Sequence, residues 1–235
     1  MKRWDQCTAL VTGGKGDIGK AITADLIARG VTVFTTSREA NSNTNFHWDM
    51  SEDTSSSALI KNIKSKKLTF DMLVHCAHIF STSNLIFQVK PEDFEKSLSE
   101  NIAPLYALLR QISRSMYRKG FGRILLMGSQ ISIYGGAGKI SYIVEKSAFN
   151  GLAMGFSAEF YDAGVSTNVL HPSVIDTETI RDRVDSEILE RLASANTSGK
   201  LLSIEDVVYA TIPLIDPTIK VLSGQQVELT GGAQW

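Results

Sequence analysis

The chain has 235 residues, of which 43% are hydrophobic and 21% are charged, with 24 Lys and Arg against 25 Asp and Glu. These proportions exclude wholesale disorder, collagen and a long coiled coil, and the net charge of −1 gives no general attraction for nucleic acid or an anionic membrane. Cys7 and Cys76 are too few for a disulfide framework, and no targeting or membrane-spanning stretch is visible. We therefore expect a cytoplasmic protein with reduced thiols that binds neither nucleic acid nor membranes.

Short runs rich in Val, Ile, Leu and Phe alternate with longer amphipathic stretches along the whole chain. Because these runs are continuously apolar, they predict parallel strands in a sheet covered on both faces. In chain order the predicted strands are 7–12, 31–36, 46–49, 71–76, 123–128, 165–170 and 226–229. The predicted helices are 18–29, 55–65, 92–118, 141–162 and 204–214, with shorter turns in 178–196. No repeat or Pro/Gly-rich linker divides the chain, so we predict a single α/β domain over 1–235, a Rossmann-like doubly wound parallel sheet of about seven strands with helices on both faces.

One predicted connection is too short for an ordinary crossover. Only seven residues lie between Arg38 and Phe46. A parallel crossover normally needs about a dozen residues, usually including a helix. Seven extended residues span at most about 25 Å, which is just enough to recross a short strand. We therefore predict a loop without a helix between Arg38 and Phe46.

A glycine-rich turn follows the first predicted strand. Residues 12–19 read Thr-Gly-Gly-Lys-Gly-Asp-Ile-Gly and lead into an amphipathic helix. Glycines let the chain turn tightly and let a pyrophosphate approach the backbone N–H groups at the helix N-terminus. Asp17 stands between Gly13 and Gly19 where a further glycine is expected. We predict that Asp17 is the N-cap of the helix, with its carboxylate turned away from the phosphates.

The end of the second predicted strand bears on the choice of nucleotide. An NAD-selective site usually carries an acidic residue about 20 residues beyond the glycines, where it binds the ribose hydroxyls. Here the chain has Ser37 and Arg38, and a guanidinium can bind a 2′-phosphate through two parallel hydrogen bonds. Lys15 can add a second positive charge. The sequence favours NADP(H) over NAD(H), although NAD(H) stays possible if Arg38 is only a solvated loop cation.

A second group of polar residues lies further along the chain. Ser129 follows a predicted strand, and thirteen residues later comes Tyr142, which on a helix shares one face with Lys146. Asn101 lies in the predicted helix 92–118. Pro104 follows it and lacks the N–H that would bond the carbonyl of residue 100, so we predict a kink there. Taken singly, Tyr142 could be an interface tyrosine and Ser129 a turn residue.

Together, the Thr-Gly-x-x-x-Gly-x-Gly turn and the quartet of Asn101, Ser129, Tyr142 and Lys146 resemble the short-chain dehydrogenase/reductase family, in particular its 3-oxoacyl-carrier-protein-reductase-like members. The resemblance implies an NAD(P)-dependent oxidoreductase that transfers hydride between nicotinamide and a ketone or secondary alcohol. It makes Tyr142 the general acid and base, and Ser129 the group that holds the substrate oxygen. Lys146 then binds the nicotinamide ribose and lowers the pKa of the Tyr142 phenol, while Asn101 holds a water in a proton relay.

The resemblance covers nearly the whole chain and implies further cofactor contacts. The sequence departs from the family pattern at three positions, Asp17, His78 and Ser173, each of which stands in place of a glycine. The expected cofactor-binding residues are Gly13, Lys15, Gly16, Asp17, Ile18, Gly19, Ser37, Arg38, Asp49, Met50, Cys76, Ala77, Tyr142, Lys146, Pro172, Ile175 and Thr177. We expect no metal site, because His75 and His78 lack a further set of ligands.

The polar segment 178–200 resembles the mobile substrate lid of the family. We expect a small carbonyl or alcohol substrate, and a homodimer or homotetramer packed through helices 92–118 and 141–162. Gly120 and Ala163 stand where carrier-protein reductases tend to carry docking arginines, which argues against a carrier-bound substrate. The expected pocket residues are Gln130, Ile131, Gly135, Gly136 and Ile140.

Two other functions stay open at this point. One is a regulatory protein that binds a dinucleotide without turnover, and the other is a lyase or epimerase built on the same scaffold. A fold by itself does not separate these from a reductase. The quartet favours the reductase.

Overall fold

The computed structural model describes residues 2–39, 42–81 and 83–232. The described strands form one parallel sheet in the order β3-β2-β1-β4-β5-β6-β7. The strands are β1 (Thr8–Thr12), β2 (Thr32–Ser37), β3 (Asn45–His47), β4 (Met72–His75), β5 (Gly122–Met127), β6 (Val165–Pro172) and β7 (Gln226–Leu229). The α-helices are α1 (Asp17–Ala28), α2 (Ser55–Ser65), α3 (Pro91–Asn101), α4 (Ala103–Lys119), α5 (Ile131–Tyr134), α6 (Ile140–Phe160), α7 (Glu178–Arg181), α8 (Ser186–Ala195) and α9 (Ile204–Ile215), and two 3-10 turns are η1 (Trp4–Gln6) and η2 (Ile86–Gln88).

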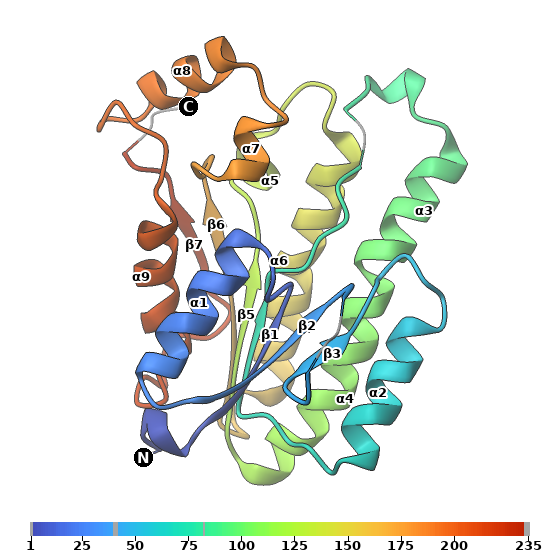
Figure 1. Cartoon of the computed structure of the whole chain (residues 1–235), viewed down its shortest axis with the longest axis vertical. Helices are drawn as coiled ribbons and strands as arrows, with labels where there is room; N and C mark the ends of the chain where they lie inside the picture. Colours follow the sequence, from blue (N-terminus) through green and yellow to red (C-terminus); the bar gives the residue numbers. More distant parts are fainter. Residues whose placement is uncertain (1, 40–41, 82, 233–235) are drawn as a thin grey trace.

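Helices cover both faces of the sheet, with α1 and α9 on one side and α2, α4 and α6 on the other (Figure 1). Neighbouring residues of a central strand point to opposite faces. Leu73 of β4 therefore packs into the core beneath α2, α4 and α6, whereas Met72 and Val74 pack beneath α1 and α9. Because both faces are buried, the central strands β4 and β5 are mostly apolar on both faces. The predicted Rossmann-like doubly wound sheet is confirmed.

The long helix predicted over 92–118 is divided in two. α3 ends at Asn101 and α4 begins at Ala103, so the break falls at Ile102, two residues before Pro104. This agrees with the predicted kink, because proline cannot supply the backbone N–H that the preceding turn needs.

Two other segments bear on the predictions. β3 pairs in parallel with β2, and the described part of the connection between them contains no helix, as predicted, while its residues 40 and 41 lie outside the described residues. The segment 178–196 is more regular than the shorter turns we predicted, because α8 is a helix of 10 residues. Acidic residues in the first turn of α8, such as Glu187, suit the positive end of the helix dipole.

Several expected features can be checked on the described residues alone. None of their helices is both long and apolar enough to cross a bilayer. Cys7 and Cys76 are free thiols, as expected. No three His, Cys, Asp or Glu side chains within those ranges gather into a group that could hold a metal ion.

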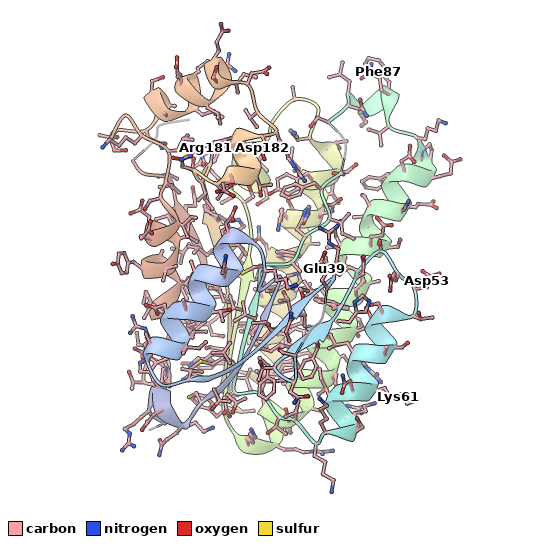
Figure 2. The ribbon with its side chains drawn as sticks, in the orientation of Figure 1. Glu39, Asp53, Lys61, Phe87, Arg181 and Asp182 are labelled. Atoms are coloured by element: carbon pink, nitrogen blue, oxygen red, sulfur yellow. The ribbon has the colours of Figure 1, made fainter. Side chains whose placement is uncertain are left out.

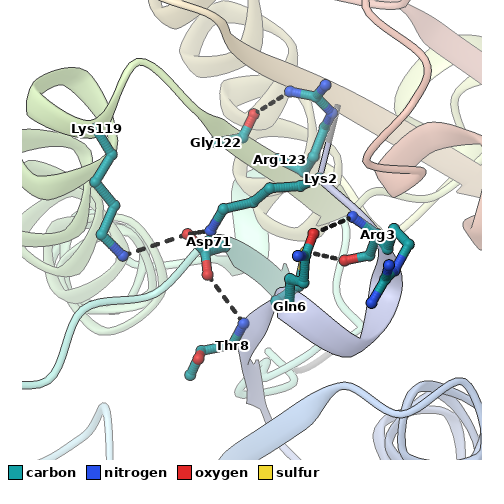
Figure 3. Close-up of polar contacts among 9 residues, drawn as sticks. Lys2, Arg3, Gln6, Thr8, Asp71, Lys119, Gly122 and Arg123 are labelled. Atoms are coloured by element: carbon teal, nitrogen blue, oxygen red, sulfur yellow. Dashed lines mark hydrogen bonds and ion pairs between the residues drawn. The ribbon is translucent and has the colours of Figure 1, made fainter.

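A buried carboxylate holds the N-terminal segment against the sheet, at the edge opposite the C-terminal ends of the strands. Asp71, whose side chain is 4% exposed, accepts hydrogen bonds from Lys2 Nζ at 2.6 Å and Lys119 Nζ at 3.3 Å. The backbone N–H of Thr8 donates to its other oxygen at 3.0 Å. Figure 3 shows the two lysines and Thr8 converging on this carboxylate.

Replacing Asp71 with asparagine is expected to lower the free energy of unfolding by about 1–3 kcal/mol at pH 7. Burial raises the pKa of Asp71, but the bonds from Lys2 and Thr8 and the charge of Lys119 outweigh this effect. The pKa of Asp71 in the folded protein therefore lies below its usual value. A carboxylate of this kind stabilises the fold above its unfolded pKa of about 3.9 and loses that effect as the pH falls through the folded pKa.

Urea denaturation at pH 7, 4 and 3 measures the effect, because the contribution is lost below the unfolded pKa. The gap between wild type and Asp71→Asn should be largest at pH 7 and shrink at acidic pH. The matched control is Asp53→Asn, whose exposed side chain is labelled in Figure 2 and whose removal should leave stability nearly unchanged. A gap that grows towards acidic pH would contradict this account of Asp71.

Candidate active site

The predicted site residues gather at the C-terminal edge of the sheet. The strand order reverses between β1 and β4, and ligands of open α/β sheets bind at such a switch point. The glycine-rich turn follows β1, Cys76 and Ala77 follow β4, and Ser129 follows β5. Residues that are far apart in the sequence therefore face one region.

The turn between β1 and α1 is packed too tightly for side chains. Gly13 has a φ of +67°, and a Cβ there would lie 2.9 Å from the backbone nitrogen of Ala77. At Gly19 a Cβ would lie 2.3 Å from the carbonyl oxygen of Gly13. The turn is as tight as the sequence predicted, and it is also held close to the end of β4, which the sequence did not predict.

The N-terminus of α1 fits a pyrophosphate, but Asp17 does not cap it. The N-cap is Gly16, which has no side chain to bond the first-turn N–H groups, so these donors are free of a capping side chain. Asp17 is the first helical residue instead, and the prediction of an Asp17 cap is wrong. The reason is the bond from Lys20 N to Gly16 O at 2.8 Å, which starts the helix one residue earlier. Asp17 therefore adds a negative charge to the first turn.

The residues expected to bind the adenosine end of the cofactor carry opposite charges. The exposed Arg38 follows β2, and Lys15 Nζ lies 3.3 Å from the Glu39 carboxylate, which Figure 2 labels. The Lys15 charge is therefore shared with an acid that we did not consider in the sequence. Ser37 donates its hydroxyl to the Glu39 carbonyl at 2.8 Å and thereby shapes the turn after β2.

Two more expected cofactor contacts have structural partners of their own. Asp49 Oδ1 accepts bonds from the backbone and the hydroxyl of Ser51, at 2.9 and 2.7 Å, while the adjacent Met50 is buried. At the end of β4, the Thr12 hydroxyl accepts the N–H groups of Cys76 and Ala77, both at 3.2 Å. These bonds fix the backbone of the segment after β4 against the end of β1.

His75 completes this arrangement from within the core. Its Nδ1 lies 2.8 Å from the Thr12 hydroxyl, which already accepts two N–H groups and so must donate its own proton to the ring. Burial lowers the pKa of His75 to about 3, so the ring is neutral. His75 is a packed core residue.

Ser129, Tyr142 and Lys146 come together between the end of β5 and the first turns of α6. The Ser129 side chain lies close enough to the Tyr142 phenol to hold its pKa down. The Lys146 ammonium is buried, donates to the Met127 carbonyl at 2.8 Å and lies 5.8 Å from the centre of the Tyr142 ring. The three side chains that the sequence grouped therefore form one cluster.

The pKa of Tyr142 departs from our expectation. We predicted that the Lys146 ammonium, together with a positively charged nicotinamide in the oxidised complex, would lower it. In the protein alone burial raises it, and the interaction with the Ser129 side chain offsets only part of this rise. Lys146 is itself desolvated, and burial lowers its pKa to about 8. In the protein alone, desolvation therefore outweighs the attraction between the two charges.

Asn101 ties the chain down next to this cluster. Its Oδ1 accepts the N–H of Ile79 at 2.8 Å, while its Nδ2 donates to the Ile79 carbonyl at 3.0 Å and to Ser97 O at 3.1 Å. Both amide hydrogens are thus used by the backbone. The side chain fixes the segment after β4, whereas the resemblance had implied a role in holding water.

Sequence reasoning missed His171, whose ring contacts the backbone of Ser129. His171 Nε2 bonds Asn150 Oδ1 at 2.9 Å, which places the ring proton on Nε2 and leaves Nδ1 to accept the Ser129 N–H at 3.3 Å. The contact also explains Gly128, because a Cβ there would lie 2.5 Å from His171 Nδ1. The only signal in the sequence was a histidine at the end of an apolar strand.

The segment after β6 leads to α7 and α8. Pro172 ends β6, Ile175 is buried against Leu202, and the Thr177 hydroxyl caps α7 by accepting the N–H of Ile180 at 3.2 Å. Figure 2 shows Arg181 and Asp182 of this segment at the same end of the molecule as Phe87.

An aromatic contact joins this segment to the cluster. The Arg183 guanidinium lies 4.8 Å from the centre of the Phe80 ring, and the Phe80 ring centre is 6.2 Å from that of Tyr142. Phe80 therefore lies between the segment 178–200 and the candidate proton donor.

Comparison with known proteins agrees with this geometry. The family model described as short chain dehydrogenase matches residues 7–188. The 3-oxoacyl-(acyl-carrier-protein) reductase FabG of Salmonella typhimurium is 26% identical over 95% of this chain and 96% of its own length. Among solved structures, a gluconate 5-dehydrogenase from Burkholderia cenocepacia in complex with NADP and tartrate has a TM-score of 0.87 and 22% identity, covering 98% of this chain and 96% of its own. ElxO with NADPH bound has a TM-score of 0.85 and 25% identity, covering 99% and 98%.

Proposed function

Because the chain belongs to the short-chain dehydrogenase family and is thus an NAD(P)-dependent oxidoreductase, we propose that it reduces a small ketone to a secondary alcohol with NADPH, reversibly, with Tyr142 as proton donor. The observation that carries the proposal is the grouping of Ser129 and Tyr142 beside the buried Lys146, which lies 5.8 Å from the centre of the Tyr142 ring, at the edge where the strand order reverses. A regulatory dinucleotide binder does not need a proton donor of this kind, whereas a lyase or epimerase on the same scaffold is distinguished by the assays below.

Each residue of the cluster has a separate task in this proposal. Bound NADPH supplies the hydride that adds to the carbonyl carbon. The Ser129 hydroxyl binds the substrate oxygen and stabilises the charge that develops on it, and Tyr142 delivers a proton to the same oxygen. Lys146 holds the nicotinamide ribose, and Asn101 keeps the segment after β4 in place through Ile79.

The preference for NADPH rests on charge at the end of β2. Arg38 is exposed there, and a guanidinium binds a phosphate with charge-assisted, two-pronged hydrogen bonds. Lys15 lies nearby but pairs with Glu39, so Arg38 is the main phosphate ligand. The similar structures with NADP and with NADPH bound support the same choice.

Replacing Arg38 with alanine is expected to raise the KM for NADPH about 10-fold to 100-fold, which corresponds to a lost charge-assisted bond, while the KM for NADH changes little. The control is Glu39→Gln, which frees Lys15 and should leave the KM for NADPH equal or lower. An equal rise in KM for both nucleotides, or no rise in either, would contradict the role of Arg38.

The proposed substrate is a free small ketone, with the segment 178–200 as its lid and a homodimer or homotetramer as the active form. FabG is named for a carrier-bound substrate. Gly120 and Ala163 offer no positive charge for docking an acidic carrier, and this favours a free ketone. The expected lining residues Gln130 and Ile131 lie directly beside Ser129, which supports their contact with substrate.

A panel of aliphatic, cyclic and sugar-derived ketones, each followed by NADPH oxidation at 340 nm, tests the proposed function. At least one ketone should be turned over, and the corresponding alcohol should reduce NADP⁺ in the reverse assay. A protein that binds NADPH but turns over none of them would favour the regulatory alternative. Turnover without net change in NADPH would favour a lyase or epimerase.

A further inference from the structure

A buried pair of titratable side chains, His78 and Glu145, lies against Tyr142 and has no task in the reaction described above. His78 follows β4, and Glu145 lies on α6 directly before Lys146. His78 Nε2 and Glu145 Oε2 are 2.8 Å apart, and the two side chains are 6% and 0% exposed. Burying two such groups is costly unless they bond each other, so the bond between them is needed to offset the cost of their burial.

The pair is in direct contact with the proposed proton donor. The His78 and Tyr142 rings meet edge to face, with centres 5.0 Å apart at 83°. The next residue, Ile79, has both of its backbone groups bonded by Asn101, so His78 is held at a fixed place. His78 stands where the family pattern has a glycine, and its side chain makes a contact with the Tyr142 ring that a glycine could not make.

Burial also determines which protons the pair can hold. It lowers the pKa of His78 to about 2, so the imidazole stays neutral. Burial raises the pKa of Glu145 to about 7, although Ser97 and Lys146 act in the opposite direction. The Glu145 carboxyl therefore changes its charge near neutral pH, beside Tyr142.

Two protonation states of the pair follow from this. At acidic pH the Glu145 carboxylic acid donates to Nε2 of His78, and the ring proton is on Nδ1, an atom without a hydrogen-bond partner among the described residues. At alkaline pH the ring donates from Nε2 to the carboxylate, and the proton that was on Nδ1 has been lost to solvent. One proton leaves, the net charge falls by one, and the hydrogen bond is kept in both states.

We propose that the His78–Glu145 pair positions Tyr142 and, through the charge of Glu145, sets the pH range in which Tyr142 takes up a proton from an alcohol. This inference rests on the proposed function. The Glu145 carboxylate opposes formation of the nearby Tyr142 phenolate, which alcohol oxidation requires. The other titratable or charged groups facing the pair are Tyr142 and Lys146 on α6, His75 at the end of β4, and Glu100 on α3.

The first test is the pH profile of kcat/KM for alcohol oxidation in wild type and Glu145→Gln. Glutamine keeps a hydrogen bond to His78 but has no charge, so the phenolate forms at lower pH and the rising limb should move to lower pH by about 0.5–1 unit. Glu159→Gln, the same change at an exposed position of the same helix, should leave the profile in place. A Glu145→Gln profile that coincides with wild type would overturn the inference.

The second test separates positioning from folding. His78→Leu removes the bond to Glu145 and is expected to lower kcat about 10-fold or more, with the Kd for NADPH unchanged. His78→Gln, which can still bond Glu145, should recover part of kcat. Equal kcat in His78→Leu and wild type, or equal losses in kcat and in NADPH affinity, would contradict a positioning role.

A third measurement needs no turnover. Nitrogen-15 NMR of the four histidine rings, with His78 assigned through His78→Gln, reports the tautomer of each ring. The His78 ring should stay neutral and change from Nδ1–H to Nε2–H near pH 7, and Glu145→Gln should abolish this change. If the change occurs but no ketone or alcohol is turned over, the proposed function fails and the link to Tyr142 fails with it. If turnover occurs without the change, only the inference fails.

Discussion

Tyr142→Phe is expected to lower kcat for ketone reduction by about 10²–10⁴-fold, the usual contribution of a general acid, while the Kd for NADPH stays within about threefold. The substitution removes only the phenol oxygen. The ring keeps its contacts with His78 and Phe80, so the packing around α6 is preserved. Steady-state NADPH oxidation and NADPH fluorescence titration measure the two quantities separately.

Tyr209→Phe on α9 is the matched control. Its side chain is 69% exposed and lies away from the cluster, so kcat should be that of wild type. A Tyr142→Phe protein with wild-type turnover would rule out the proposed mechanism. A loss of kcat accompanied by an equal loss of NADPH affinity would instead make Tyr142 a binding residue.

Gly19→Ala is expected to weaken NADPH binding about 10-fold to 100-fold. Alanine normally stabilises a helix by about 1 kcal/mol relative to glycine, so the local preference favours the substitution. The added Cβ, however, would lie 2.3 Å from the Gly13 carbonyl oxygen, and neither the backbone oxygen nor a Cβ fixed to Cα can turn away by rotating a side chain. The turn between β1 and α1 must therefore shift, and such overpacking typically costs about 1–3 kcal/mol.

Gly151→Ala provides the control, because this glycine of α6 has nothing within 4 Å of an added Cβ. Its thermal stability should be equal or higher and its Kd for NADPH unchanged. NADPH titration and thermal unfolding of both variants distinguish a local shift of the turn from general destabilisation. Wild-type affinity in Gly19→Ala would show that the turn can move without cost.

The fold could be predicted from the sequence because its strands are buried on both faces. A strand such as β4, apolar at each of its first three positions, has few alternative readings, and Pro104 marks a helix break by its chemistry. α8 was underestimated although its sequence is amphipathic, because none of its residues is buried and it lies in a polar, charge-rich segment. The N-cap of α1 was wrong by one residue because a backbone bond between Lys20 and Gly16 decided it.

The candidate site could be predicted only where its residues follow a regular spacing. Tyr142 and Lys146 are one helical turn apart, and Ser129 ends a strand. His171 and the His78–Glu145 pair contact partners that are 42 and 67 residues away, and such contacts depend on strand register and helix placement. The raised pKa of Tyr142 was missed for a related reason, since desolvation depends on everything that surrounds a group.

Phe80 gives the proposed lid a mechanical connection to catalysis. The Phe80 ring lies under the Arg183 guanidinium on one side and beside the Tyr142 ring, the proposed proton donor, on the other. If a bulky substrate displaces Arg183, Phe80 loses that contact and no longer holds the Tyr142 ring as firmly. Large ketones should therefore lose turnover rate as well as affinity, whereas compact ones that leave the stack intact should lose neither.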